Sequence, residues 1–325
     1  MVKKHLISGI TGQDGIFLTS YILKNNKNDL VYGISRNQNK ENFEKRIIHT
    51  LGDSKKINNL KIINVDITNE NDTSKIIYEI KPNYLYNLSG PSSVYKSMLD
   101  GGTTHNQIIQ IFNNLINPII KENLKCNIFQ ASSSEMFDLS SDPLDEKSNF
   151  NPRSPYAEAK LHLHRHIEEV KTDHKINISS GIMFNHESEF RDDEYLIMKI
   201  INSAISINKK KKGKLKVGSL NLVRDWSYAK DIAKAIYLIN MENGSEDYVI
   251  GSGIGNNVKN ILKIVFEYYD LNWEDFVIVD ESLLRKGDPE SIISNPKKIK
   301  ERLNWNAETS LKEILTKCME YKELN

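Results

Sequence analysis

Residues 6–15 have the sequence LISGITGQDG, and this stretch decides the fold. The apolar residues before the first glycine predict a strand, and an amphipathic helical pattern follows the last glycine of the stretch. In a dinucleotide-binding turn, one glycine permits the tight turn, a second lets backbone amides approach a pyrophosphate, and a third lets the helix pack closely. Gly9, Gly12 and Gly15 have a spacing that suits these three roles. The stretch therefore predicts a βαβ unit that binds a dinucleotide, and three turn glycines that bind nothing are the alternative.

Short β-rich runs alternate with longer amphipathic stretches through the first half of the chain. This alternation predicts an α/β fold with a Rossmann-type doubly wound parallel sheet. The less regular later part predicts a smaller, mostly C-terminal substrate-binding α/β domain. We assign residues 1–186, with 224–255 returning, to the dinucleotide-binding domain, and residues 187–223 and 256–325 to the substrate domain. We expect strands at residues 6–8, 30–34, 60–65, 84–88, 127–131, 178–183 and 248–251, and late helices at residues 297–303 and 311–317.

The composition excludes several classes of partner. The 325 residues carry 44 Lys and Arg against 43 Asp and Glu, a formal net charge of +1. No global field therefore recruits nucleic acid or an anionic membrane. The lysine run at residues 209–212 predicts a solvated loop, and a weaker alternative is that one of these lysines faces a substrate phosphate.

The cysteines and the N-terminus indicate a compartment. Cys126 and Cys318 lie far apart in the sequence, without the spacing of metal ligands, which argues against a disulfide scaffold or a metal site. The N-terminus lacks the apolar core of a signal peptide, and no apolar run approaches a membrane-spanning length. We therefore expect a cytoplasmic protein without nucleic-acid or membrane partners.

The end of the second expected strand selects the dinucleotide. NAD-preferring sites place a carboxylate there, but residues 31–37 read VYGISRN, with Arg36 and no acid. A guanidinium forms charge-assisted bonds to phosphate, so NADP is the predicted cofactor, against the alternative of an ordinary exposed loop arginine. After the third strand, Asp66 and Ile67 are expected to contact the adenine, although Asp66 could instead cap a helix.

A tyrosine and a lysine lie one helical turn apart in the segment YAEAK, residues 156–160. Ser154 and Pro155 suit the N-cap and first position of a helix, which puts Tyr156 and Lys160 on one face. The ammonium, together with the charge of an oxidised nicotinamide, is expected to lower the pKa of the phenol. Tyr156 is therefore predicted to be the base for an alcohol that loses hydride.

Residues 130–137, QASSSEMF, follow the fifth expected strand. A serine hydroxyl there can bond the O4 atom of a sugar and align it with Tyr156. A carboxylate two residues further on, Glu135, can remove a proton alpha to a new ketone, which elimination of water requires. The alternative for Glu135 is an acid stabilised at a helix N-terminus.

The chain resembles the GDP-mannose 4,6-dehydratases, a family of extended short-chain dehydrogenases/reductases, over essentially its whole length. The matching segments are GITGQDG at 9–15, NL at 87–88, SSV at 92–94, PRSPYAEAK at 152–160, GIMFNHES at 181–188, KI at 199–200, RDW at 224–226 and AKD at 229–231. The resemblance implies that Ser133 replaces a catalytic threonine, that Glu135 is the elimination base, and that Tyr156 and Lys160 serve the redox step. The residues implied to bind the cofactor are Gly9, Thr11, Gly12, Gln13, Asp14, Gly15, Arg36, Asp66, Ile67, Leu88, Tyr156, Lys160, His186 and Arg191. Those implied to bind the substrate are Ser92, Asn185, Lys199, Gly218, Arg224, Arg285 and Glu290.

The resemblance also implies a reaction and an assembly. Tyr156 would take the O4 proton as hydride leaves C4 for NADP, Glu135 would take the C5 proton as the C6 hydroxyl leaves as water, and the hydride would return to C6. The product of a GDP-sugar would be a GDP-4-keto-6-deoxy sugar. Similar enzymes are dimers or tetramers, and tetramers are joined through the basic loop that corresponds here to residues 36–45.

The departures from the family lie near the expected sugar. Serine replaces threonine at Ser133, residues 89–91 read SGP in place of small residues and a glutamine, and Ser219 replaces an asparagine. Mannose and a manno-heptose therefore both stay open as the sugar. A sugar-nucleotide 4-epimerase or a 4-keto reductase of the same fold is the alternative enzyme, and a non-catalytic NADP-sensing protein is the alternative from another class.

Overall fold

One parallel sheet organises the first part of the chain. The computed structural model describes residues 2–36, 40–52, 54–138, 143–242, 244–284 and 288–324. Its seven-stranded sheet has the order β10-β6-β5-β4-β1-β2-β3, and the neighbouring strands are all parallel. The strands are β1 (Lys4–Ser8), β2 (Leu30–Ser35), β3 (Leu60–Asn64), β4 (Tyr84–Asn87), β5 (Asn127–Ser133), β6 (Ile178–Met183) and β10 (Tyr248–Ile250). This is the predicted α/β, doubly wound fold, and its strand order reverses between β1 and β4, where such sheets bind ligands.

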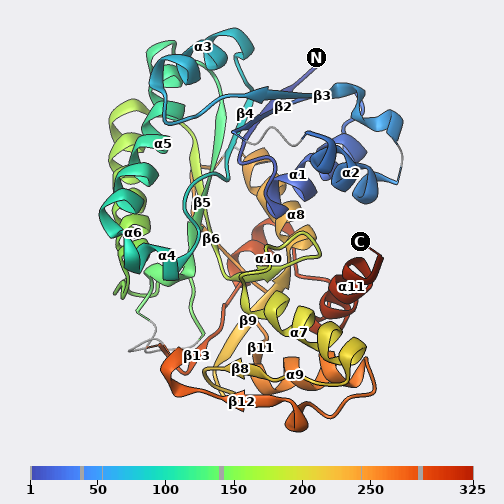
Figure 1. The fold of residues 1–325 in the computed structure, drawn as a ribbon. Helices are drawn as coiled ribbons and strands as arrows, with labels where there is room; N and C mark the ends of the chain where they lie inside the picture. The colour runs from blue at the N-terminus through green and yellow to red at the C-terminus, as the bar shows by residue number, and fades with distance from the viewer. Residues whose placement is uncertain are drawn as a thin grey trace.

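Helices cover both faces of this sheet (Figure 1). On one face lie α1 (Gln13–Asn25), α2 (Lys40–Leu51) and α8 (Ala229–Met241), and on the other lie α3 (Glu70–Ile80), α5 (Gly101–Lys121) and α6 (Pro155–His174). Because successive strand residues point to opposite faces, Ile7 packs in the core with α1 and its neighbour Leu6 packs in the core with α5. The sheet is thus buried on both sides, which explains its near-continuous apolar strands.

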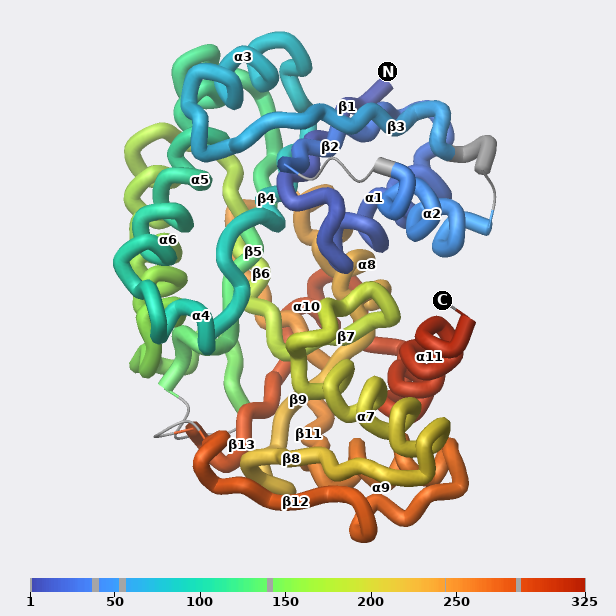
Figure 2. The backbone as a smooth tube through the Cα atoms, viewed as in Figure 1, coloured from blue at the N-terminus to red at the C-terminus, as the bar shows by residue number. Residues whose placement is uncertain are grey.

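The later part of the chain builds a second, smaller unit, which lies below the first sheet in Figure 2. Its main sheet joins β11 (Gly255–Asn257), β9 (Val223–Tyr228) and β13 (Ser291–Ile292), and β7 (Asn185–Glu187) pairs with β9. A second pair consists of β8 (Leu215–Val217) and β12 (Val277–Val279). Helices α7 (Leu196–Lys210), α9 (Val258–Glu267) and α11 (Leu311–Leu324) surround these strands, whereas α10 (Lys297–Leu303) packs against β10 of the first sheet. Strand β10 is part of the first sheet, and α8 packs against that sheet. The exact domain boundaries stay a prediction.

The short elements connect these units. They are α4 (Val94–Leu99), which precedes α5, and the 3-10 turns η1 (Ser54–Asn59), η2 (Ser134–Met136), η3 (Trp273–Asp275) and η4 (Glu281–Leu283). One prediction about a connection was wrong. The stretch 36–45 was expected to be a basic loop, but α2 already begins at Lys40, and residues 37–39 lie outside the described part of the chain.

Most predicted elements are confirmed with shifted ends. Strand β5 continues to Ser133, beyond the predicted end at residue 131, and α11 continues to Leu324. The lysine run at 209–212 is exposed, as predicted, but it is not all loop: Lys209 and Lys210 end α7, and Lys211 is its C-cap in a left-handed conformation. Both cysteines are free and buried. Within the described residues, no helix is long and apolar enough to cross a membrane.

Candidate active site

The glycine turn brings the N-terminus of α1 to the carboxyl end of β1. Gly9 has a φ of 73°, and a Cβ atom there would lie 2.8 Å from the carbonyl oxygen of Leu88. A Cβ atom on Gly15 would lie 2.5 Å from the Cα atom of Ile10. Gly12 is the N-cap of α1 and has no side chain to bond the first-turn amides. This glycine cradle and the positive end of the helix dipole suit a pyrophosphate.

Three residues predicted to bind the cofactor bind one another. Gln13 donates to the backbone oxygen of His186 at 3.1 Å and accepts from the hydroxyl of Ser188 at 2.8 Å. The Nε2 atom of His186 lies 3.1 Å from the carboxylate of Asp14, and its Nδ1 atom lies 2.8 Å from the oxygen of Phe184. Burial alone would lower the pKa of His186, but Asp14 raises it above its usual value. Since both ring nitrogens face acceptors, the imidazolium form is favoured, and the ion pair clamps α1 to β7.

The residues that follow β2 and β3, which pair in parallel, come close together beside the glycine turn. A guanidinium nitrogen of Arg36 lies 4.0 Å from a carboxylate oxygen of Asp66, and the Arg36 side chain is 71% exposed. Asp66 accepts from the amide and hydroxyl of Thr68, bonds that lower the pKa of its carboxyl. Helix α3 is capped by Asn69, so the alternative in which Asp66 is the helix cap is wrong. Ile67, the next residue, is buried.

The catalytic candidates meet where β5 ends against α6. Ser154 accepts from the amide of Ala157 at 3.1 Å, which confirms the predicted N-cap. The hydroxyl of Tyr156 is hydrogen-bonded to that of Ser133. The ammonium of Lys160 lies 5.7 Å from the centre of the Tyr156 ring and donates to the backbone oxygen of Ala131 at 3.0 Å. These contacts bring together three of the four predicted catalytic side chains.

Burial dominates the acidity of this pair. It raises the pKa of Tyr156 to about 12, and the bond from Ser133 only partly opposes this. It also lowers the pKa of Lys160 from 10.5 to about 8. The predicted lowering of the Tyr156 pKa is therefore wrong for the protein alone, because the ammonium bonds a backbone carbonyl and the phenol lies away from water.

Glu135 lies beside the same phenol. It is in the three-residue turn η2, where its amide donates to the hydroxyl of Ser133 at 3.3 Å. Its carboxylate acts on the Tyr156 pKa, raising it, so the two side chains are close in space. A single 3-10 turn has almost no macrodipole, which removes the physical basis of the helix-terminus alternative. Because β5 continues to Ser133, the strand itself aims this turn at α6.

Most of the predicted substrate residues are spread over the second unit, whereas Ser92 follows β4 of the first sheet. Asn185 and Lys199 are exposed, as is Glu290. Arg224 is nearly buried and forms an ion pair of 2.8 Å with Asp288. A Cβ atom on Gly218 would make a tight contact of 3.2 Å with the backbone of Leu283. Arg285 lies outside the described residues.

Three residues near the site have positions that the sequence did not predict. The guanidinium of Arg191, predicted to be on the cofactor side, lies 3.5 Å from the centre of the Tyr195 ring, and its charge lowers the Tyr156 pKa. The Tyr195 hydroxyl lies 3.1 Å from that of Ser92. Tyr195 was not predicted as a site residue, although it lies four positions, about one helical turn, before the predicted substrate residue Lys199. Ser97 was also missed, and its hydroxyl accepts from the amide of Tyr156 at 3.2 Å.

The fold and this arrangement at the carboxyl edge of the sheet define an extended short-chain dehydrogenase/reductase. Two solved structures share the fold: a UDP-glucose 4-epimerase of Thermotoga maritima (TM-score 0.84, 21% identity, 99% and 100% of the two chains) and the dTDP-glucose 4,6-dehydratase DesIV of Streptomyces venezuelae (TM-score 0.84, 18% identity, 99% and 97%). Residues 6–318 match the GDP-mannose 4,6 dehydratase family. GDP-mannose 4,6 dehydratase 2 of Arabidopsis thaliana is 31% identical over 96% of this chain and 85% of its own length. The chain belongs to the GDP-mannose 4,6-dehydratase family, and it is an enzyme of the hydro-lyase class.

Proposed function

We propose that this enzyme removes water from a GDP-bound, manno-configured sugar and forms a GDP-4-keto-6-deoxy sugar. The observation that carries the proposal is the position of Glu135, a carboxylate beside the Ser133, Tyr156 and Lys160 group. A 4-epimerase needs only a hydroxyl and the tyrosine–lysine pair. An additional base beside the phenol is what an elimination requires.

The side chains divide the proton transfers among them. The hydroxyls of Ser133 and Tyr156 hold the sugar O4 atom, and Tyr156 takes its proton as C4 becomes a ketone. The ketone acidifies the C5 proton, which Glu135 removes. The electron pair of that C–H bond then forms the C5–C6 double bond, and the C6 hydroxyl leaves with the proton as water. Lys160 places an ammonium 5.7 Å from the centre of the Tyr156 ring, and the charge of Arg191 lowers the pKa of the phenol.

A nicotinamide dinucleotide fits the glycine turn, since Gly12 leaves the N-terminus of α1 without a side chain, whereas Gly9 and Gly15 let the turn pack against the backbone of Leu88 and Ile10. When bound, such a group supplies a hydride acceptor for C4 and a hydride donor for C6. We propose NADP, because the exposed guanidinium of Arg36 stands at the end of β2, where a carboxylate would favour NAD. The solved DesIV structure has NAD bound. Equal affinity of this enzyme for the two dinucleotides would refute the preference.

The family relatives support guanosine diphosphate as the carrier, since they are named for GDP-mannose. Lys199 supplies an exposed cation for the phosphates, and Asn185 supplies an exposed amide. We propose that the sugar is mannose or a manno-heptose. Both are retained because Ser133 and residues 89–91, which differ from the family pattern, lie near the expected sugar-binding pocket.

The test is mass spectrometry of the products from GDP-mannose, a GDP-manno-heptose, dTDP-glucose and UDP-glucose. We expect a GDP-sugar to lose one water, without net formation of reduced cofactor. Loss of water only from the dTDP- or UDP-sugar would refute the nucleotide. An isomer of unchanged mass would indicate a 4-epimerase, and consumption of stoichiometric NADPH would indicate a reductase.

We also propose an oligomeric state and a cellular compartment. By resemblance, the enzyme is a homodimer or homotetramer in the cytoplasm that binds no nucleic acid and no membrane. Sedimentation velocity would test the assembly, and a monomer at micromolar concentration would contradict it.

A further inference from the structure

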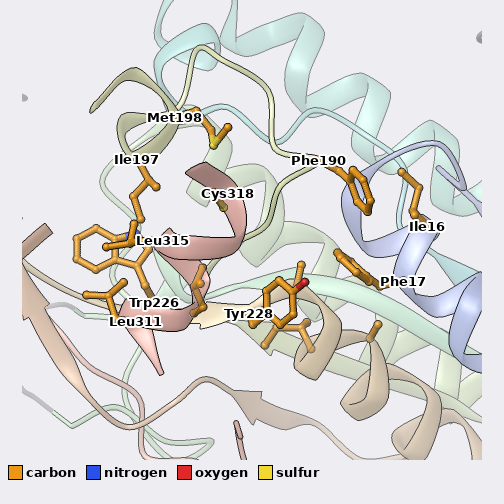
Figure 3. Close-up of a cluster of buried hydrophobic side chains, with 14 of the residues drawn as sticks. Ile16, Phe17, Phe190, Ile197, Met198, Trp226, Tyr228, Leu311, Leu315 and Cys318 are labelled. Atoms are coloured by element: carbon orange, nitrogen blue, oxygen red, sulfur yellow. The ribbon is translucent and has the colours of Figure 1, made fainter. Parts of the chain in front are cut away.

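Residues 188–195, which we call the strap, cross from β7 to α7 along the edge of the site. Its outer side is held by Phe190, whose buried ring lies 5.3 Å from the ring of Phe17 on α1 and 5.3 Å from that of Tyr321 on α11. Figure 3 shows Phe190 next to Phe17 and Ile16, at the margin of the main core. The strap is therefore anchored in the core.

The inner side of the strap contacts the segment that follows β4. The carboxylate of Glu194 lies 2.8 Å from the ammonium of Lys96, and the hydroxyl of Tyr195 lies 3.1 Å from that of Ser92. The Tyr195 ring is also stacked under Arg191, whose Cζ atom is 3.5 Å from the ring centre. Cation–π stacking of this kind fixes an aromatic ring, so little conformational entropy is lost when its hydroxyl binds a ligand.

Tyr195 lies between the two ends of the proposed substrate site. Both Tyr195 and Arg191 act on the Tyr156 pKa, the former raising it and the latter lowering it, which puts them near the catalytic phenol. Tyr195 is also the N-cap of α7, and its backbone oxygen accepts from the amide of Lys199 at 2.9 Å. One helical turn, about 5.4 Å of rise, thus leads from Tyr195 to the cation proposed for the nucleotide.

We infer that Tyr195 is a substrate-contacting residue: its hydroxyl binds a hydroxyl of the hexose, in exchange for the bond to Ser92. This inference rests on the proposed function. A phenol and a serine hydroxyl can each donate and accept, so a sugar hydroxyl inserted between them satisfies both. The contact selects the sugar, and the nucleotide is bound elsewhere along α7.

The experiment compares Tyr195→Phe with the unmutated enzyme. The substitution keeps the ring and its stacking on Arg191, and it removes only the hydroxyl. We expect KM for GDP-mannose to rise about tenfold, the value of one hydrogen bond, while the Kd for GDP measured by calorimetry stays within about twofold. Ser92→Ala should raise KM similarly, and the double variant should raise it by less than the product of the two, because the residues share one ligand.

Lys96→Ala is the matched control. It removes the other link between the strap and the segment after β4, but that exposed ion pair contributes little, so KM should change by less than about twofold. An unchanged KM in folded Tyr195→Phe overturns the inference, and so does an equal loss of affinity for GDP. Failure of the unmutated enzyme to dehydrate any GDP-sugar would instead refute the proposed function, so the two failures are distinguishable.

Discussion

Lys160 is a predicted catalytic residue whose burial lowers the stability of the folded protein. Its pKa is lowered by burial from 10.5 to about 8, so the folded protein holds its proton less tightly than the unfolded chain. Between these two values the unfolded chain binds more protons, and stability therefore rises with pH across that window. Below pH 8, the buried ammonium destabilises the fold.

We therefore expect Lys160→Met to raise the free energy of unfolding at pH 7 by about 2 kcal/mol, since the lost bond to Ala131 offsets part of the effect. The variant should also lose the rise in stability between pH 8 and pH 10.5. Urea denaturation across this range measures both effects. Lys263→Met, on an exposed side chain, is the control, and a Lys160→Met protein less stable at pH 7 would contradict the argument.

Glu135→Gln tests the elimination step. The amide keeps the shape of the side chain but cannot take a proton, so water loss should slow about 10² to 10⁴-fold, the contribution of a positioned base. Oxidation at C4 should survive, and reduced nicotinamide should accumulate transiently in stopped-flow absorbance. Tyr156→Phe should stop the reaction before any hydride moves.

Glu158, exposed in the first turn of α6, provides the matched control for this substitution. Glu158→Gln should leave turnover unchanged. Near-normal water loss by the Glu135→Gln enzyme would remove the main reason to consider this protein a dehydratase.

Local spacing determines which site residues the sequence reveals. Tyr156 and Lys160 share a helix face, and Ser133 and Glu135 share one turn, so short-range pattern was enough to select them. Tyr195 and Ser92 are separated by 103 positions, and only the folded strap brings them together. The raised pKa of Tyr156 could not be predicted from the sequence either, because it depends on burial by elements from several parts of the chain.

At the scale of elements, the start of α1 depends on close backbone approach at Gly15. Gly15→Ala should improve helix propensity by roughly 1 kcal/mol, but its methyl group would lie 2.5 Å from the backbone of Ile10. We expect a net loss of about 1–3 kcal/mol of stability, as in other overpacked sites, together with weaker dinucleotide binding. Thermal denaturation and cofactor titration measure the two effects.

Gly102, inside α5, is the control for this prediction, because an added Cβ atom there meets no heavy atom within 4 Å. Gly102→Ala should leave stability unchanged or raise it by up to about 1 kcal/mol. Equal effects of the two substitutions on stability would show that helix propensity, and not close backbone packing, determines the effect at Gly15.

Elements differed in how well the sequence predicted them. The apolar run of β10 was clear, since its three residues are all buried and a strand buried on both faces needs no alternation. The strands β7, β11 and β13 have only 3, 3 and 2 residues, and they are defined by pairing with β9 across long separations. No periodicity can develop over such lengths, so the second unit was predicted only in outline.

For the whole molecule, the cofactor preference should appear as a difference in stability. A ligand at 100 times its Kd raises the free energy of unfolding by about 2.7 kcal/mol. At equal concentrations, we expect NADP to stabilise the enzyme more than NAD, by about 1–3 kcal/mol. Arg36→Ala should abolish this difference, whereas Arg165→Ala, on the exposed face of α6, should preserve it. Differential scanning fluorimetry with both dinucleotides measures it, and identical shifts for the two in the unmutated protein would exclude the preference.

The contact between α11 and the strap has a consequence for biosynthesis. Translation makes the catalytic residues early, and Ser133, Glu135, Tyr156 and Lys160 all leave the ribosome long before Tyr321 and Lys322. Yet Tyr321 packs on Phe190, and Lys322 bonds Asp193 at 2.6 Å. A nascent chain that already contains every predicted catalytic group therefore still lacks the outer support of the strap, and the strap is complete only after α11 has been synthesised.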